Sequence, residues 1–522
     1  MAKHARYDES IKDEHYDAIC IGSGIGSLTT AGLLARAGRK VLVLEQHYEP
    51  GGFCHSFKRK KFEWDVGVHY VGAMHSPHTI ERKALDHLSD GELHWANMDS
   101  PYDRAIVDGV TYDFVSEMHD QIDLWVSYFP EEEEAIHRYW DLVRECSRSV
   151  FSYFGERAMP GIMSMAMGGM MRKKFTSFSD RTTYEVLRDL TDNETLITVL
   201  CAQCGDYGLS PRDSSFGIHA LIVNHYRNGA SYPVGGASQI HQSIIKGIES
   251  RGGKVVVLAP VQEIVLEGNK AVGVKMDNGD VLRTPIVISG IGVGNTFGKL
   301  LPADLKLPFD WRGDLSKVKS SMAHNCLYIG LDVTAQTLKL PKYNYWVYDE
   351  ESKDKPNGER TASAYISFPS AKDPVWTEAH GDTATIQCIS GVKYDEVAAW
   401  ADTKIKKRGD AYETYKQEFK EKMLKQLYKL HPEIESHVVV AEVSTPLSTA
   451  HFSGYDQGQI YGLEHTPERF RIKWLRPKTP IKGLYLTGQD VACAGVAGAL
   501  FAGLLTASAL LKKNMIGELK KL

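Results

Sequence analysis

Three closely spaced glycines and one acidic residue carry the clearest chemical signal in the sequence. Gly22, Gly24 and Gly26 follow a short apolar segment, and Glu45 lies 23 residues after the first of them. Glycines in this pattern let the backbone turn tightly and approach a pyrophosphate where a Cβ atom would clash. An acidic side chain at this distance can accept hydrogen bonds from ribose hydroxyls. Together these residues predict a dinucleotide-binding site.

The elements that must position these residues are a strand, a helix and a second strand. Residues 16–21 are typical of a short buried strand, and the helix that begins near Ile25 would direct its N-terminal amides at the pyrophosphate. Residues 41–44 indicate the second parallel strand. Ser27 stands where the pattern usually has a third glycine, but its small side chain still allows close packing of the helix on the strand.

Length, charge and cysteine content limit the class of protein. A chain of 522 residues exceeds what one hydrophobic core usually supports, so we expect two domains. The formal net charge of -5 offers no general attraction to nucleic acid, and no nucleic-acid partner is expected. The eight cysteines are scattered, with a single C-x-x-C pair at Cys201 and Cys204. This spacing indicates reduced thiols of an intracellular protein and predicts no metal site.

Two segments bear on the membrane question. The N-terminal residues are polar and of mixed charge, without the apolar core of a signal peptide, so a cytoplasmic protein is expected. Residues 491–511 form an uncharged run that is formally long enough to span a bilayer. Its alanine and glycine content favours a helix buried inside the nucleotide domain, and a C-terminal membrane anchor is the alternative.

A family resemblance becomes specific just after Glu45. The segment E-Q-H is followed by G-G-F-C-H-S-F, from Gly51, and then by W-D-V-G-V-H-Y-V-G, from Trp64. These motifs resemble the phytoene desaturase, carotenoid isomerase and retinol saturase group of flavoproteins, with the retinol saturases most similar. The resemblance implies an FAD cofactor.

The C-terminal part of the chain carries the remaining flavin motifs of that group. By resemblance, the box L-T-G-Q-D, which ends at Asp490, places its acid near the ribityl chain and pyrophosphate of FAD. The turn that follows would begin a helix whose amides face the flavin, and the backbone at Val261 would meet the adenine. The implied cofactor-binding residues are Gly22, Gly24, Ile25, Gly26, Ser27, Glu45, Gln46, Gly51, Gly52, Phe53, Gly67, Val261, Gly488, Asp490, Gly495, Val496 and Ala497.

A second glycine-rich turn at Gly290, Gly292 and Gly294 lacks the helix and the acid that a pyridine-nucleotide site needs. We expect it to return the chain past the flavin, and no separate NAD(P)H domain is predicted. Reducing equivalents are therefore expected from an external electron donor.

The predicted fold is α/β, with a Rossmann-type FAD-binding domain of the amine oxidase and phytoene desaturase type. An α+β substrate-binding domain interrupts it. The expected FAD-binding segments are 1–73, 207–300 and 441–522, and the substrate-binding segments are 74–206 and 301–440. Residues 254–266 are expected to form paired strands that return to the nucleotide domain.

The resemblance implies saturation of one carbon–carbon double bond in a lipophilic conjugated polyene. His69 and Tyr70 are the first candidates for the flavin-facing wall, and Tyr207 and His225 for proton supply. For each of these side chains, a buried residue that only hydrogen-bonds the backbone is the alternative. A polyene isomerase or desaturase and a non-catalytic lipid-binding flavoprotein are the competing functions. The natural substrate, whether retinoid, carotenoid or unsaturated lipid, is left open.

Residues 159–174 have the most unusual composition in the chain, with six of its fourteen methionines followed by Arg172, Lys173 and Lys174. Flexible methionines can line a channel for an apolar ligand. The same segment can also lie on an anionic membrane surface, on the inner face of the membrane. A disordered or core-packed loop is the third interpretation.

Overall fold

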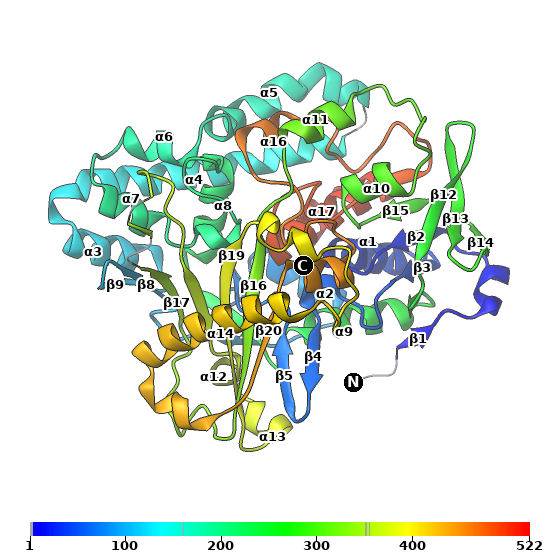
Figure 1. Cartoon of the computed structure of the whole chain (residues 1–522). Coiled ribbons are helices and arrows are strands. Elements are labelled where there is room, and N and C mark those ends of the chain that lie inside the picture. The colour runs from blue at the N-terminus through cyan, green and yellow to red at the C-terminus, as the bar shows by residue number, and fades with distance from the viewer. Residues whose placement is uncertain (1–3, 160, 350–351, 354) are drawn as a thin grey trace.

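The computed structural model describes residues 4–159, 161–349, 352–353 and 355–522. Two sheets dominate it, one built around the glycine-rich turn and the other around the middle of the chain, and a group of helices covers one side (Figure 1). The mixed α/β class predicted from the sequence is confirmed.

The first sheet contains six short strands, and every neighbouring pair in it is parallel. In spatial order the strands are β1 (Ala5–Arg6), β11 (Lys254–Val257), β3 (Val41–Leu44), β2 (Ala18–Ile21), β15 (Val287–Ser289) and β21 (Leu484–Leu486). Both β2 and β3 are buried along their whole length, as continuous apolar runs in a parallel sheet should be. The sheet brings the glycine-rich turn and the C-terminal motif to neighbouring positions.

The expectation that residues 254–266 pair with each other is wrong. The strand β11 lies between β1 and β3 in the first sheet, whereas β12 (Val261–Glu267) pairs with β13 (Lys270–Met276), which in turn pairs with β14 (Val281–Arg283). Leu258 has a positive φ of 54°, and Pro260 has no backbone N–H. The chain therefore leaves the first sheet between the two strands.

Helices cover the first sheet and hold its glycine-rich turn. The helix α1 (Ile25–Arg36) packs against both α17 (Gly495–Leu511) and α9 (Ser238–Glu249), and α2 (Ile80–Leu88) packs on α9. Leu500, Leu504 and Leu505 of α17 are buried, which confirms the internal helix expected within residues 491–511. None of the helices described is both long and apolar enough to cross a membrane.

The second sheet has seven strands and is antiparallel except for the pair β17 and β8. In spatial order they are β20 (Val438–Ser444), β16 (Ala323–Leu331), β19 (Ala384–Val392), β18 (Ala364–Ser367), β17 (Asn344–Tyr348), β8 (Asp103–Val107) and β9 (Val110–Phe114). The long helix α14 (Asp410–Leu430) packs on β20. A small sheet of β6 (Val71–Gly72), β10 (Ala230–Pro233) and β7 (Trp95–Asn97) joins segments from both predicted domains.

A group of helices covers one side of the molecule (Figure 1). It contains α3 (Met118–Tyr128), α4 (Glu133–Ala158), α5 (Gly161–Ser179), α6 (Thr183–Arg188), α7 (Glu194–Leu200) and α8 (Phe216–Tyr226). The remaining elements are β4 (Ser56–Arg59), β5 (Phe62–Asp65), α10 (Val293–Lys299), α11 (Trp311–Lys317), α12 (Pro369–Lys372), α13 (Trp376–His380), α15 (Pro446–Ser453), α16 (Pro467–Arg471) and α18 (Met515–Leu519).

Two elements lie across or beside the predicted domain boundaries. The helix α8 follows residue 206 but packs against α4 and α5, and β20 begins before residue 440 and ends after it. The division of the chain into two discontinuous domains stays a prediction, and these two elements do not follow its boundaries.

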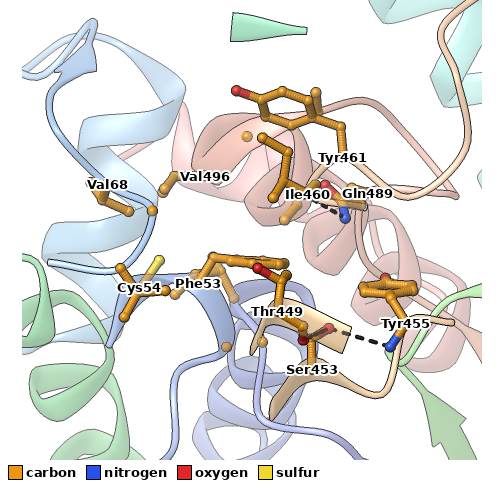
Figure 2. A pocket seen from close by; sticks show the side chains of 18 of the residues that line it. Phe53, Cys54, Val68, Thr449, Ser453, Tyr455, Ile460, Tyr461, Gln489 and Val496 are labelled. Carbon is orange, nitrogen blue, oxygen red and sulfur yellow. Dashed lines mark hydrogen bonds between the residues drawn. The ribbon is translucent and has the colours of Figure 1, made fainter. Parts of the chain in front are cut away.

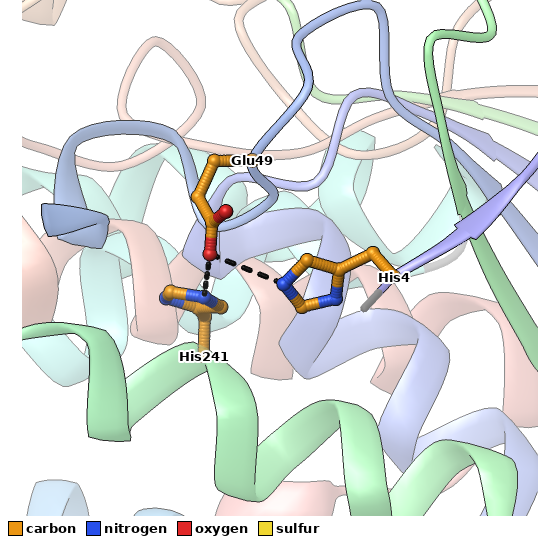
Figure 3. Close-up of side chains that lie close together, drawn as sticks. All are labelled: His4, Glu49 and His241. Atoms are coloured by element: carbon orange, nitrogen blue, oxygen red, sulfur yellow. Dashed lines mark hydrogen bonds and ion pairs between the residues drawn. The ribbon is translucent and has the colours of Figure 1, made fainter. Parts of the chain in front are cut away.

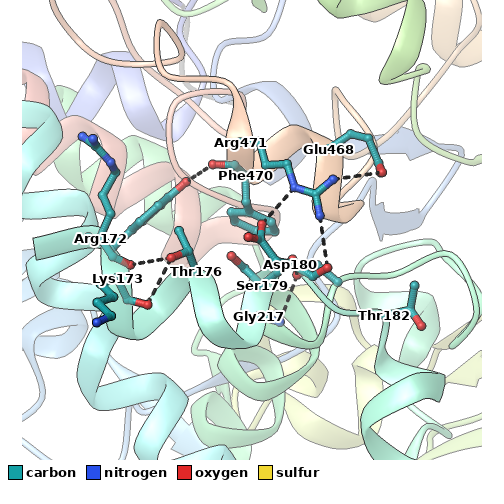
Figure 4. Close-up of polar contacts among 12 residues, drawn as sticks. Arg172, Lys173, Thr176, Ser179, Asp180, Thr182, Gly217, Glu468, Phe470 and Arg471 are labelled. Carbon is teal, nitrogen blue, oxygen red and sulfur yellow. Dashed lines mark hydrogen bonds and ion pairs between the residues drawn. The ribbon is translucent and has the colours of Figure 1, made fainter. Parts of the chain in front are cut away.

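Two arginines of α16 differ sharply in their surroundings. Arg469 is 2% exposed, and its guanidinium donates to the carbonyl oxygens of Leu463, Gln489 and Ala492. Arg471 instead lies at the surface, where it pairs with Asp180 and Glu468 (Figure 4). Because Gln489 and Ala492 flank Asp490, the buried arginine holds the turn that carries the C-terminal motif.

Replacing Arg469 by methionine should lower the free energy of unfolding by about 3 kcal/mol or more, since it leaves buried carbonyls without donors. The matched change Arg471→Met should cost no more than about 1 kcal/mol, because it removes surface ion pairs and one exposed hydrogen bond to the carbonyl oxygen of Asp180. Denaturant unfolding of both variants measures the difference. Equal losses for the two variants would contradict the role assigned to Arg469.

Candidate active site

One cavity of about 850 Å³ connects the glycine-rich turn with the second sheet. Figure 2 shows part of its wall, with Phe53 and Val68 on one side and Ile460 and Tyr461 on the other. In this wall the side-chain amide of Gln489 donates to the carbonyl oxygen of Ile460 over 3.3 Å. The cavity is large enough for more than one small organic group.

Most of the residues predicted to bind a cofactor lie in the wall of this cavity. They are Gly22, Gly24, Ile25, Gly26, Glu45, Gln46, Gly51, Gly52, Phe53, Gly67, Val261, Gly488, Asp490, Gly495, Val496 and Ala497. Segments that are hundreds of residues apart in the sequence therefore border the same space.

Ser27 is the exception among the predicted cofactor residues, since it is not one of the described residues that line the cavity. It is buried, and an added Cβ at Gly290 would lie 2.1 Å from its hydroxyl oxygen. Ser27 therefore packs α1 against the chain that follows β15. Its small size serves helix–strand contact, as the position in the pattern requires.

Two helices direct their N-termini into the cavity. The first turn of α1 begins after Gly24 and that of α17 after Ala494, and in neither does a side chain cap the helix. An added Cβ at Gly26 would lie 2.6 Å from the backbone nitrogen of Gly488, so only glycine permits this approach of α1 to the C-terminal motif. Uncapped amides and the positive ends of two helix dipoles favour anionic or electron-rich ligand groups.

The two predicted acids, Glu45 and Asp490, border the cavity and also accept hydrogen bonds from backbone amides. Glu45 accepts hydrogen bonds from the amide of Ser23 over 2.9 Å and from the amide of His47 over 2.8 Å. Asp490 accepts from the amides of Val293 over 2.9 Å and of Leu463 over 3.0 Å. Both carboxylates thus fix the loops around the cavity, a second role that the motifs alone did not indicate.

Tyrosines form a stacked wall further along the cavity. The ring of Tyr70 stacks on Tyr226 with centroids 4.7 Å apart, and on Tyr365 at 6.3 Å. Trp346 lies against Tyr365 at 4.5 Å. A flat, apolar wall of this kind suits an extended conjugated ligand.

A buried and a half-buried acid, Asp103 and Asp206, lie at the same wall, and sequence reasoning missed them. The hydroxyl oxygen of Tyr70 lies 2.9 Å from Asp103 Oδ2 and 3.0 Å from Asp206 Oδ2. Asp103 also accepts hydrogen bonds from the side chains of Gln203, Asn344 and Trp346. Asp206 borders the cavity, whereas Asp103 lies behind Tyr70.

Asp103 and Asp206 favour different protonation states. Burial and the charge of Asp103 raise the pKa of Asp206 well above its usual range. Burial also raises the pKa of Asp103, but the donors around it oppose this effect. Tyr70 has one hydroxyl hydrogen and cannot donate to both acids. The consistent arrangement is a protonated Asp206 that donates to Tyr70, which donates to an ionised Asp103.

A buried lysine extends this network. The ammonium group of Lys372 donates to the carbonyl oxygen of His69 over 3.0 Å, to Ser367 Oγ over 2.7 Å and to Asn344 Oδ1. Burial lowers its pKa to about 7. No sequence motif marks Lys372. Asp206 belongs to the segment C-G-D-Y, residues 204–207, where a lone acid was the available signal.

The four residues predicted to take part in catalysis lie in different places. His69, Tyr70 and His225 line the cavity, and Tyr207 is not among its described lining residues. The Tyr207 hydroxyl instead lies 3.2 Å from His219 Nδ1. Burial lowers the pKa of His69 to about 3 and of His225 to about 4, so both are neutral near pH 7. The ring of His225 accepts a hydrogen bond from the backbone amide of Gly72. This contact fits the alternative in which the histidine only hydrogen-bonds the backbone.

Comparison with known proteins gives the family. Residues 20–86 match the NAD(P)-binding Rossmann-like domain family. The all-trans-retinol 13,14-reductase of Danio rerio is 37% identical over 96% of this chain and 87% of its own length, and that of Homo sapiens is 34% identical over 98% and 88%. The chain belongs to the all-trans-retinol 13,14-reductase family. It is therefore an oxidoreductase of the predicted flavoprotein group.

Other proteins that resemble this chain are named for different activities. Cyclohexylamine oxidase from Brevibacterium oxydans shares the fold, with a TM-score of 0.63 at 16% identity over 97% of this chain and 100% of its own. A prolycopene isomerase of an Oncidium hybrid cultivar is 26% identical over 95% of this chain and 83% of its own length. A Danio rerio relative named as an inactive all-trans-retinol 13,14-reductase is 31% identical over 96% and 86%. Because these relatives are named for different activities, the reaction must be argued from the residues of the site.

Replacing Gly26 by alanine should abolish cofactor retention, because the new Cβ would meet backbone atoms at Gly488 that cannot move aside independently of the turn. Gly294→Ala is the control, since an added Cβ there meets no atom within 4 Å. The absorbance of bound cofactor per chain after gel filtration measures the effect. Normal cofactor content in Gly26→Ala would contradict the cradle described here.

Proposed function

We propose that the protein uses FAD to saturate one carbon–carbon double bond of a lipophilic conjugated polyene of the retinoid or carotenoid class. The observation that carries the proposal is that a nucleotide cradle, a tyrosine wall and Asp206, which Tyr70 links to the buried Asp103, border one cavity. The names of the related reductases support the substrate class. An external electron donor completes the proposed reaction.

The residues around the cradle fit FAD. The uncapped N-terminus of α1 would hold the pyrophosphate, Glu45 the ribose, and the N-terminus of α17 at Gly495–Ala497 the electron-rich edge of the flavin. Gly26 leaves room that a Cβ would fill. When bound, the flavin supplies a hydride equivalent for reduction of the double bond.

The protein's own part in the reaction begins with positioning. Tyr70, Tyr226 and Tyr365 would hold the flat polyene and exclude water around it, because stacked aromatic side chains favour extended apolar ligands. Several similar double bonds follow one another in a polyene. The bond that is reduced is therefore the one that the cavity presents to both the cofactor and the proton source.

Asp206 is the proposed proton donor. Its raised pKa keeps a proton on the carboxyl group near pH 7, and its place on the cavity wall gives that proton access to a ligand. As the proton leaves, the Tyr70 hydroxyl can turn its one hydrogen from Asp103, which keeps three other donors, to the new Asp206 carboxylate 3.0 Å away. His69 and His225 are less suitable, since burial keeps both neutral.

Two relatives have names that match the competing functions: one is a prolycopene isomerase, and the other is named as an inactive reductase. A direct assay separates them. The purified protein is reduced anaerobically with dithionite, mixed with all-trans-retinol, and followed by flavin absorbance and product mass. Reoxidation with a gain of two hydrogens supports the reductase. A change of geometry at constant mass favours an isomerase, and no change of either kind would overturn the proposed substrate class.

Asp206→Asn should slow double-bond reduction by about 100-fold or more, because the amide cannot supply the proton. Asp213→Asn, which changes an exposed acid seven residues away, should react at the normal rate. Single-turnover reoxidation of the reduced flavin by retinol measures both. Cofactor content and retinol affinity should stay normal in Asp206→Asn, which separates a lost proton from a damaged fold.

The pH dependence provides an independent check on the same residue. Asp206 is active when protonated, so the wild-type rate should be constant below its raised pKa and fall as the pH rises through it. This decline should be missing in Asp206→Asn. A variant with the same decline as the wild type would assign the proton to another group.

We also propose that α5 contacts the membrane from which the substrate is taken. Of the residues 159–174, Pro160 lies outside the described part of the chain, and none that is described lines the cavity. Met163, Met167 and Met170 share one helical face and are 48%, 42% and 72% exposed. This exposure argues against both the channel and the core-packed interpretation. Phe151 of the neighbouring α4 is exposed and also lines the cavity, which joins this side to the substrate space.

Replacing Met163, Met167 and Met170 together by glutamine should weaken binding to phosphatidylcholine vesicles by about 10-fold or more, because the apolar face supplies the binding energy. Added anionic lipid should strengthen binding only modestly, since Arg172 and Lys174 already pair with Glu156 and Glu145. Vesicle sedimentation measures both effects. Val439→Thr, at an exposed site on β20, is the control. Unchanged binding in the triple variant would contradict the proposal.

A further inference from the structure

Three side chains from distant parts of the sequence converge behind the cofactor cradle. His4 Nε2 lies 3.1 Å and His241 Nε2 3.9 Å from the same Glu49 oxygen, and the three ligand atoms all lie within 4.8 Å of one another (Figure 3). Two imidazole nitrogens and a carboxylate oxygen around one point form a ligand set that transition metals use.

The cluster is largely buried, and its Glu49 also borders the cavity. The side chain of His241 is 0% exposed, that of Glu49 7% and that of His4 11%. Buried polar groups of this kind normally have partners. The Nε2 atom of His241 has none within hydrogen-bond distance, although it is directed at the Glu49 carboxylate.

The hydrogen bond at the other ring nitrogen of His241 makes this atom a free electron-pair donor. Its Nδ1 lies 3.4 Å from the carbonyl oxygen of Cys54, a contact that requires a hydrogen on Nδ1. Nε2 then carries a lone pair that faces a carboxylate. A metal ion between the two would bind electron pairs from both, and a backbone contact at the other ring nitrogen is common for metal-bound histidine.

We propose that His4, Glu49 and His241 bind a divalent transition-metal ion of the Zn²⁺ class. Nitrogen and carboxylate ligands in this number suit Zn²⁺, with water at the remaining position. The cysteine spacing in the sequence predicted no metal site, and the three residues of this one are too far apart in the chain to form a spacing motif.

The position of the cluster gives the ion a structural role. An added Cβ at Gly51, whose φ is 106°, would lie 2.5 Å from His241 Nδ1, so the imidazole supports the Gly51–Gly52 turn of the cradle from behind. His4 immediately precedes β1, and His241 belongs to α9. The ion would join the N-terminal segment, the cradle loop and α9, and so hold the loop in place for the cofactor.

Metal content tests the proposal directly. Holoprotein without a histidine tag is stripped with a chelator, equilibrated with Zn²⁺, dialysed and analysed by mass spectrometry for zinc and protein. We expect about one zinc per chain in the wild type and at least about 10-fold weaker zinc binding in His4→Ala and His241→Ala. His15→Ala, which removes an exposed histidine of the same N-terminal segment, should bind zinc normally.

A buried substitution such as His241→Ala can also impair folding, so a second measurement uses the wild type alone. Crystals of the zinc-equilibrated protein should give an anomalous scattering peak between His4, Glu49 and His241. Wild-type protein without zinc, zinc that both substitutions leave in place, or a peak elsewhere would each overturn the proposal. None of these results depends on turnover, so the outcome is independent of the proposed reaction.

Discussion

The contact between the start of α1 and the C-terminal motif is the constraint on which the rest of the site depends. Gly26 meets the backbone of Gly488 at a distance that no other residue type permits, and α17 packs along α1 from there. This approach aligns two helix N-termini on one cavity. It also requires Arg469 to satisfy the carbonyl groups of the turn from behind. A cofactor cradle thus results from backbone packing, with few charged side chains.

The tyrosine wall of the cavity depends on how charge and protons are shared between Asp103 and Asp206. Asp103 and Asp206 lie close together and away from bulk solvent, where two carboxylates cannot both be charged at low cost. Donors from three side chains stabilise charge on Asp103, and the proton therefore resides on Asp206. The tyrosine that links the acids also forms the flat wall of the cavity. In the proposed reaction, Tyr70 would therefore couple the positioning of the polyene to the supply of the proton.

The sequence predicted the parts of the site that local backbone chemistry defines. The first glycine-rich turn, the strand at 41–44 and the helix within 491–511 could be identified because glycine spacing and apolar runs act over short distances. Asp103, Asp206 and Lys372 could not, since their protonation arises only when β8, the C-G-D-Y segment and α12 meet. The seven-stranded sheet was missed for the same reason: β8 pairs with β17 from more than 200 residues away.

A crystal structure of the FAD-loaded protein with all-trans-retinol would show whether one cavity brings the cofactor, the polyene and Asp206 together. We expect the flavin beside Gly495–Ala497, the polyene between it and the rings of Tyr70 and Tyr226, and the Asp206 carboxyl group in contact with one polyene double bond. A polyene bound outside the cavity, or one whose double bonds all lie beyond hydrogen-bond range of Asp206, would contradict this expectation.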